Sequence, residues 1–247
     1  MIKDNYVGIE QKDRGMPIYR FTSMKRLLES LVQKQNTLLS PRKWEDPYEN
    51  ALAASLRYER KDGSTVPYPL RNRVYGQCWT IVPETDAFWR MYVPPREGVR
   101  IKSTIRKLHR SLELSCSAYA SMSCFIGRVQ YKSEEEITSL FNDNDWVKDH
   151  FRNQGTPGHV ETLLLKRTEF IPESEVRLLY LDPHNRDHGD SFSYDFDPSS
   201  TILEVTFDPR MEDTLCQTYE SILKISGFTG EINKSHLYRT PKITICV

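Results

Sequence analysis

The sequence predicts a domain of the α+β class, and three observations lead to that class. Short apolar stretches with strand spacing are separated by segments with helical spacing, yet the two kinds do not alternate as regular β-α-β units. No Gly-x-Gly-x-x-Gly follows any expected strand, which disfavours a doubly wound, dinucleotide-binding domain. The 247 residues suffice for a full core, so we expect one domain over residues 16–247, preceded by a polar, loosely ordered segment at 1–15.

In the first third of the chain the elements follow from apolar spacing and capping residues. Apolar residues recur at helical spacing after Thr22 and Ser23, either of which can cap a helix. We expect a strand at 18–21, a helix over about 24–32, a strand at 37–40, a helix over 47–58 and a strand over 74–81.

The same signals place the remaining elements. Ser133 and Glu136 form a capping box, and Asp208 followed by Pro209 is typical of a helix start. We expect a short helix that is capped by Thr85, holds Phe88, Trp89 and Tyr92, and ends at Pro94-Pro95. We expect further helices over 103–113, 133–151, 160–166 and 208–226, and strands at 99–101, 176–181, 202–207, 229–232 and 242–247. One long or two short strands are expected over 118–131, and a polar loop over 182–200.

Composition excludes several classes of protein. The chain is 38% apolar and 28% charged, which is typical of a globular protein. Its formal net charge is zero, so no overall positive potential attracts nucleic acid or an acidic membrane. No apolar run approaches the roughly 20 residues of a membrane span, and the first residues lack the apolar stretch of a secretory signal. Five cysteines without Cys-x-x-Cys suit a reducing compartment, so we expect a cytoplasmic protein with no membrane partner.

The segment from Pro172 to Tyr180 holds the strongest chemical signal. On a strand, Glu173 and Glu175 project to the same side, and two neighbouring carboxylates repel unless a cation or ligand hydroxyl lies opposite. The pair is therefore a candidate site. The alternative is a surface pair neutralised by Arg177 or Lys166, and the residues alone leave it open.

Two further segments complete a pattern. Tyr19-Arg20 lies on one expected strand and Cys78-Trp79-Thr80 on another. An Arg, a polar-aromatic motif and a Glu-x-Glu in this order resemble the three-part signature of ADP-ribosyltransferases.

The chain also resembles the bacterial domain of unknown function 2971 family, over roughly residues 15–240. The resemblance rests on Tyr19-Arg20, the Trp44-to-Glu49 segment, Trp89-x-x-Tyr92 with Gly98-Val99, and Glu173-x-Glu175-x-Arg177. The chain departs from the family pattern at two places: Glu45 stands where members usually have Asn, and Arg90-Met91 where they have a hydrophobic residue and His.

The resemblance to ADP-ribosyltransferases implies a core of two small packed β-sheets flanked by helices, with NAD as the substrate. It implies that Glu175 stabilises the oxocarbenium-like state formed when nicotinamide leaves, and that Glu173 orients or deprotonates the acceptor. Arg20, next to Tyr19, would hold the pyrophosphate or ribose.

The remaining implied roles concern the nicotinamide pocket and the partners. Thr80, Cys78 and Trp79 would support Glu175 and shape the pocket, and Trp89 or Tyr92 would stack on the nicotinamide ring. The resemblance is compatible with a toxin or an anti-phage effector restrained by an antitoxin or defence partner. The acceptor, whether protein, nucleic acid or small molecule, stays open.

Two other functions also remain. One is a metal-dependent nuclease that would use Asp46, Glu49, Glu173 and Glu175, with Lys166 or Arg177. The other is a non-catalytic protein that binds a nucleotide or a phage component. The His and Asp residues of 182–190 lie in an expected loop without metal-ligand spacing, so we assign no metal ligands.

Overall fold

The structure is a computed structural model that describes residues 5–44, 46, 48–49, 57–59, 62–67, 73–151, 157–184, 186, 188–241 and 243. The helix expected over 47–58 and the strand expected over 242–247 lie largely outside the described residues. Among the described helices, none combines the length and apolar character needed to cross a bilayer.

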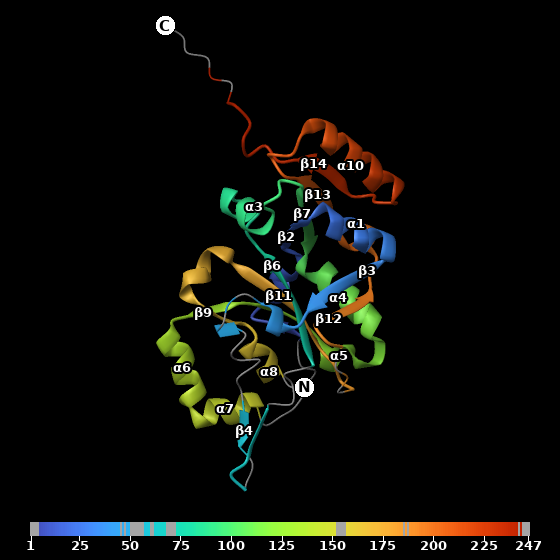
Figure 1. Ribbon diagram of the computed structural model, residues 1–247. Helices are drawn as coiled ribbons and strands as arrows, with labels where there is room; N and C mark the ends of the chain where they lie inside the picture. The colour runs from blue at the N-terminus through green and yellow to red at the C-terminus, as the bar shows by residue number, and fades with distance from the viewer. Residues whose placement is uncertain are drawn as a thin grey trace.

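Within the described residues, ten strands join into one sheet that divides into two units (Figure 1). The larger unit has the order β1-β8-β11-β6-β3-β12, with bounds Tyr6–Val7, Cys124–Arg128, Glu175–Leu181, Val74–Thr80, Gln35–Leu39 and Ser191–Asp195. The smaller unit has the order β2-β7-β13-β14, with bounds Pro17–Ser23, Gly98–Thr104, Glu204–Phe207 and Glu231–Lys234. Most neighbours are antiparallel, whereas β1-β8 and β13-β14 are parallel.

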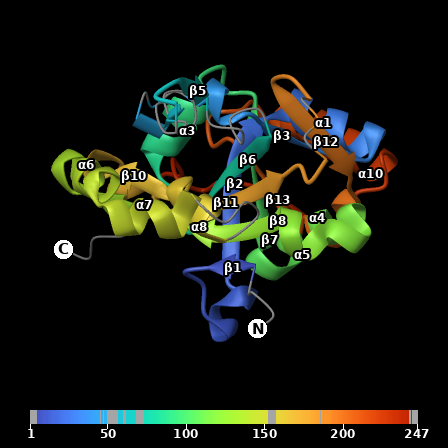
Figure 2. The same cartoon turned by 90° about the horizontal axis from the view of Figure 1, so that it is seen from below.

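Helices cover both units. On the side of the smaller unit lie α1, α3 and α10, with bounds Met24–Gln33, Asp86–Tyr92 and Asp213–Ile225. Helices α4, α5 and α9 pack nearby, with bounds Ile105–Cys116, Ala120–Ser123 and Pro198–Thr201. Figure 2 shows α6, α7 and α8 (Glu134–Asn142, Asn144–Phe151 and Pro157–Thr162) on the opposite side of the molecule from α1 and α10. These features confirm the α+β class with two β-sheet units flanked by helices.

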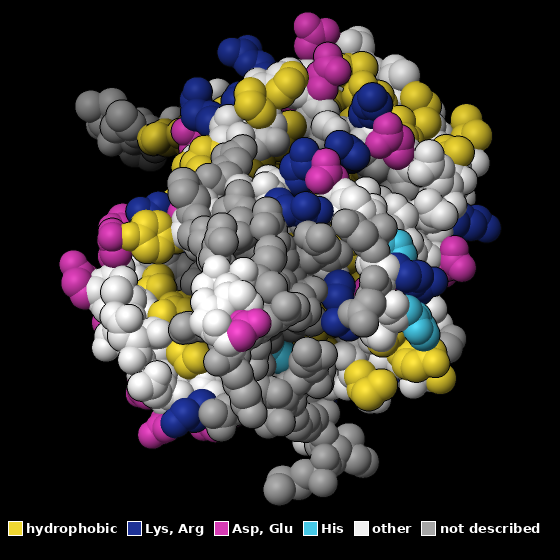
Figure 3. All heavy atoms as spheres, turned by 60° about the horizontal axis from the view of Figure 1, so that its bottom comes forward, with side chains coloured by type: hydrophobic (Ala, Val, Ile, Leu, Met, Phe, Trp, Pro, Cys, Tyr) yellow, Lys and Arg dark blue, Asp and Glu magenta, His cyan; other side chains and the backbone are white. Residues whose placement is uncertain are grey.

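Short elements complete the chain. Two small ladders pair β9 with β10 and β4 with β5; their bounds are Gln130–Lys132, Leu165–Arg167, Arg57–Glu59 and Thr65–Pro67. The 3₁₀ helices η1, η2, η4 and η5 span Gln11–Gly15, Pro41–Lys43, Ser117–Tyr119 and Thr168–Glu173. On the face drawn in Figure 3, Lys and Arg are interspersed with Asp and Glu, in keeping with the zero net charge.

Capping explains the clearest agreements with the expected elements. Ser23 accepts a hydrogen bond from the Arg26 N–H and starts α1 directly after β2. Ser133 and Glu136 form the expected capping box of α6. Thr85 caps α3 through the N–H of Phe88. Each side chain satisfies a backbone donor that the first helical turn leaves without a partner.

Three expectations from the sequence were wrong because tertiary contacts overrode local pattern. Residues 117–123 are helical rather than extended, and β8 starts only at Cys124. The polar loop expected over 182–200 contains β12, which pairs with β3, and α9. Asp208 caps a turn through the N–H of Arg210, and α10 begins later, at Asp213.

Part of the segment before residue 16, which was expected to be loosely ordered, makes defined contacts with the domain. Strand β1 pairs with the edge of β8, and the Asn5 amide donates to the carbonyls of Ala120 and Cys124 at 3.1 and 2.8 Å. Ile9 is buried in the main core. These contacts hold residues 5–9 against the domain.

Candidate active site

The strand register brings the three parts of the motif together. Tyr19 on β2 pairs with Thr80 on β6, and Thr80 pairs in turn with Glu175 on β11. The Tyr19–Thr80 pair is the one residue pair that joins β2 to β6 in the described ladders. Beyond it the two strands separate, so the motif lies where the two units of the sheet diverge.

A cavity of about 390 Å³ lies at this divergence. Its walls come from β2, β3 and β6, from α3, and from the segment that precedes β11. It has the size and the mixed apolar and polar lining of a small-molecule site. Seven of the eight site residues expected from the sequence line it: Tyr19, Arg20, Cys78, Thr80, Tyr92, Glu173 and Glu175.

Glu175 is a buried carboxylate held by cations. Its Oε2 accepts from Nε and Nη2 of Arg177, at 3.1 and 2.7 Å, and Arg177 is wholly buried. Burial alone would raise the pKa of Glu175, but the charges of Arg177 and Lys166 and a hydrogen bond from the Cys78 thiol outweigh it, and the pKa is lowered. Burial and the charge of Glu175 raise the pKa of Cys78, which keeps this donor protonated.

Lys166 links the acidic residues of the site. Its Nζ lies 2.6 Å from Glu173, 3.2 Å from Glu49 and 3.4 Å from Glu175. Burial would lower the pKa of Lys166, but the surrounding carboxylates raise it above the usual range. Arg177 bonds Glu49 as well as Glu175. Three carboxylates therefore share two buried cations at the base of the cavity.

Glu173 does not lie on a strand, which corrects the sequence prediction. It ends η5, Ser174 takes a left-handed conformation with φ of 43°, and Glu175 is the first residue of β11. Thr80 fixes this turn, because its Oγ1 donates to the Glu173 carbonyl at 2.6 Å. Both glutamates reach Lys166 all the same. Thr80 thus positions Glu173 directly and faces Glu175 across the ladder.

Arg20 has no ion-pair or hydrogen-bond partner for its side chain among the described residues. It is half-buried, and burial lowers its pKa to about 10, so it remains charged at neutral pH. A charge withdrawn from water without a partner is unfavourable, and a ligand anion relieves this cost. Arg20 therefore brings to the cavity wall a positive charge without a partner among the described residues.

The two expected aromatic platforms have different positions. Tyr92 lines the cavity, and burial together with the charge of Glu173 raises its pKa. Trp89 is wholly buried away from the cavity, against Phe21 with ring centroids 4.8 Å apart, and its Nε1 donates to Glu84. Trp89 is therefore a core residue, and the stacking role assigned to it from sequence is corrected.

Sequence reasoning missed several residues that build the site. Trp44 lines the cavity and covers the Arg177 guanidinium at 4.4 Å from the ring centroid. Gly76 permits that position, because a Cβ there would meet the Trp44 ring at 2.7 Å. The Tyr131 hydroxyl accepts from the N–H of Glu175 at 2.9 Å. Trp44 belongs to the segment that carries the family resemblance, but the sequence assigned it no role. Gly76 and Tyr131 have no local pattern, since each acts through contacts between distant segments.

The acidic residues do not form the carboxylate cluster that the nuclease alternative needs. Lys166 lies between Glu49, Glu173 and Glu175, in the position that a divalent cation would need. Asp46 also lines the cavity, but its Oδ1 pairs with Arg167 at 3.0 Å. Among the described residues no group of three or more His, Cys, Asp or Glu side chains is arranged to hold a metal ion.

Comparisons with known proteins place the chain beside one family. A sequence model of the family described as "Protein of unknown function (DUF2971)" matches residues 88–178. This match confirms the family resemblance. It includes Glu173, Glu175 and Arg177, and it is shorter than the 15–240 expected, leaving Arg20 and Thr80 outside. No curated protein matches the chain.

The comparison with solved structures finds one protein in several complexes. The chain is similar to Thermus sp. 2.9 DarT in complex with NAD⁺, with a TM-score of 0.40 and 12% identity over 92% of this chain and 97% of that one. For Thermus sp. 2.9 DarT in complex with ADP-ribosylated ssDNA the TM-score is 0.42 at 12% identity, over 92% and 96% of the two chains.

Proposed function

We propose that this protein is an NAD-dependent ADP-ribosyltransferase. One observation carries the proposal: Arg20, Thr80 and Glu175, which are far apart in the sequence, line one cavity. The ordered motif predicts this meeting, whereas three unrelated surface residues would not converge. The cavity then supplies an anion site at one wall and an ionised carboxylate at another.

The charge of Glu175 suits the cleavage step. When the bond between nicotinamide and ribose breaks, positive charge develops on the sugar. A carboxylate already held in place stabilises that charge in the transition state without reorganising. Arg177, Lys166 and Cys78 hold Glu175 ionised and immobile before the substrate arrives. Catalysis by this group is therefore electrostatic.

Glu173 and Arg20 take the remaining roles. Glu173 lies at the same cavity, where its carboxylate can take the proton of an acceptor. Lys166, which donates to Glu173, stays charged in that step because it also pairs with Glu49 and Glu175. The guanidinium of Arg20 presents a fork of donors that fits the oxygens of a diphosphate. Tyr92 provides an aromatic ring at the cavity for the nicotinamide.

The first experiment measures nicotinamide release from NAD by the purified protein, with and without cell extract, in the presence and absence of a chelator. The proposal expects chelator-independent release by the parent and loss of release in Glu175→Gln. Absence of NAD turnover with every extract, protein and nucleic-acid acceptor would overturn it. Chelator-sensitive cutting of nucleic acid would favour the nuclease instead.

The biological setting forms part of the proposal. An enzyme that consumes NAD or modifies cellular acceptors harms the cell that makes it, so we propose a cytoplasmic toxin or defence effector. The cysteines that the structure describes, Cys78, Cys116, Cys124 and Cys216, are free thiols, which agrees with a reducing compartment. Induced expression of the parent should arrest growth, and expression of Glu175→Gln should not.

A further inference from the structure

A second cavity of about 240 Å³ adjoins the first, between α1, β3 and β2. The two cavities share four lining residues: Arg20, Thr37, Leu39 and Trp79. Arg20 thus stands at their junction, with Glu175 on one side only. A ligand that fills both cavities must pass Arg20.

A second cation, Arg26, lines the smaller cavity. It lies in the first turn of α1, six residues after Arg20, and its side chain has no ion-pair or hydrogen-bond partner among the residues that the structure describes. The two guanidiniums are close enough for the charge of Arg26 to lower the pKa of Arg20, after the larger effect of burial. Arg26 is exposed and Arg20 is half-buried, so the repulsion between them is partly screened by water. An anion bound between the two guanidiniums is attracted by both.

The lining of the smaller cavity suits a nucleoside. Its apolar residues come from α1, β7 and the chain beside β12 and β13: Leu27, Ile101, Phe196 and Ile202. Its polar lining supplies donors and acceptors from Thr22, Ser30, Gln33, Gln35 and Asn36, together with the carboxylate of Glu29. A flat base would contact the apolar part, and the ribose hydroxyls would meet the amides and hydroxyls.

We infer that Arg20 and Arg26 together bind the diphosphate of a nucleoside diphosphate, whose nucleoside occupies the smaller cavity. Two phosphates in series match two guanidiniums at the junction. The inference rests on the proposed function, because the nicotinamide end of the same dinucleotide would then lie beside Glu175 in the larger cavity. Arg26 becomes a binding residue that the motif does not contain.

Calorimetric titration with ADP, AMP and adenosine tests this site without any turnover. The parent should bind ADP more tightly than AMP, and AMP more tightly than adenosine. Arg26→Gln should weaken ADP binding by about tenfold or more, the effect of losing a charged hydrogen bond, and should leave adenosine binding unchanged. Arg26→Lys should recover part of the ADP affinity, because the charge remains.

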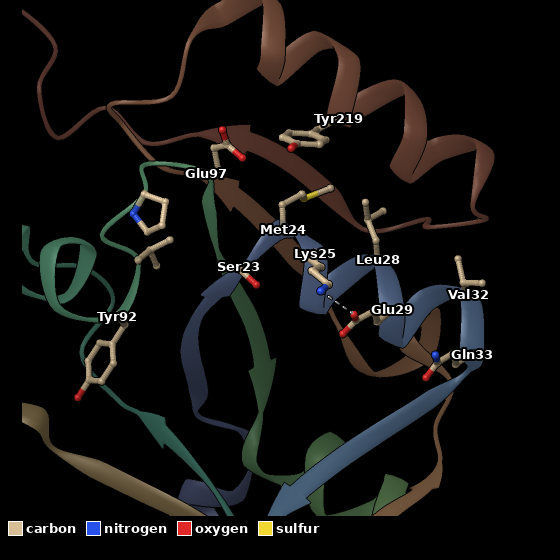
Figure 4. A pocket seen from close by; sticks show the side chains of 12 residues that line it. Ser23, Met24, Lys25, Leu28, Glu29, Val32, Gln33, Tyr92, Glu97 and Tyr219 are labelled. Atoms are coloured by element: carbon tan, nitrogen blue, oxygen red, sulfur yellow. Dashed lines mark ion pairs between the residues drawn. The ribbon is translucent and has the colours of Figure 1, made fainter. Parts of the chain in front are cut away.

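Lys25→Gln provides the matched control. It removes one positive charge from the adjacent residue, but Lys25 points into the neighbouring groove between α1 and α10, beside Glu29 at 3.8 Å (Figure 4). ADP affinity should stay at the parent value in this variant. Equal ADP affinities of Arg26→Gln, Lys25→Gln and the parent would overturn the inference, as would equal binding of ADP and adenosine by the parent.

The outcomes separate this inference from the proposed function. If ADP binding depends on Arg26 but the protein never consumes NAD, the proposed diphosphate site stands and the proposed transferase activity is rejected. If Arg26→Gln turns over NAD with an unchanged KM, the proposed transferase activity stands and the proposed diphosphate site is rejected.

Discussion

Replacing Glu175 by Gln tests the chemistry most sharply, because it removes one charge and keeps the shape. In the proposed mechanism this charge stabilises the developing cation only in the transition state. Removing a preorganised electrostatic group of this kind costs on the order of 3 kcal/mol, or at least a hundredfold in kcat. NAD affinity should change little, since ground-state contacts with Arg20 and the aromatic walls remain.

The structure also fixes the effect of Glu175→Gln on folding. The sequence alone suggests relief of repulsion between two glutamates, but Glu175 is bonded to the buried Arg177 and to Lys166. Breaking a buried ion pair costs about 3–5 kcal/mol, and we expect the lower end because Arg177 keeps Glu49 as a partner. For a chain of this size the unfolding midpoint should fall by roughly 6–12 °C.

Three assays on the parent and the variant test the role of the Glu175 charge: nicotinamide release, NAD titration and thermal unfolding. The expected result is a folded variant that binds NAD like the parent and turns it over at least a hundredfold more slowly. Full activity in Glu175→Gln would refute the role of this charge. If Glu175→Gln does not fold, Cys78→Ala replaces it in the same assays. This substitution removes a hydrogen bond to Glu175 and should lower kcat several-fold without unfolding the protein.

Four further outcomes follow from the geometry. Glu173→Gln should impair transfer to an acceptor more than hydrolysis of NAD, measured as the ratio of the two products. Arg20→Lys should raise KM for NAD about tenfold with a smaller effect on kcat, because the forked contact is lost. Thr80→Val should cost about 1 kcal/mol and lower transfer, and Thr80→Ser should restore both. Because folding lowers the pKa of Glu175, the parent should be more stable than Glu175→Gln above about pH 4.3, the usual pKa of a glutamate. This stability difference should disappear as the pH falls through the lower pKa of the folded state. Thermal unfolding of both proteins from pH 7 to pH 3 checks this.

Much of the site was predictable because its key residues lie on strands with clear apolar patterns. Strands β2, β6 and β11 carry Arg20, Thr80 and Glu175, and the order of these motifs in the chain already suggested that they meet. The register that aligns Tyr19 with Thr80 and Glu175 could not be predicted, since it depends on pairing between segments that are 61 and 95 residues apart.

The parts that sequence reasoning missed depend on tertiary contacts. Lys166 and Arg177 first appeared as surface partners of the glutamates, yet both are buried and hold three carboxylates. Trp89 and Tyr92 share a helix, and only packing against Phe21 distinguishes the core residue from the cavity residue. No sequence pattern singles out Arg26, because the role proposed for it depends on its place in the smaller cavity.

A crystal structure of Glu175→Gln with NAD tests the central claim most directly, because the variant should bind the substrate without consuming it. The account predicts the nicotinamide riboside beside residue 175 in the 390 Å³ cavity and the diphosphate within hydrogen-bond distance of Arg20. NAD bound elsewhere, or a cavity that stays empty at saturating NAD while the variant is folded, would contradict it.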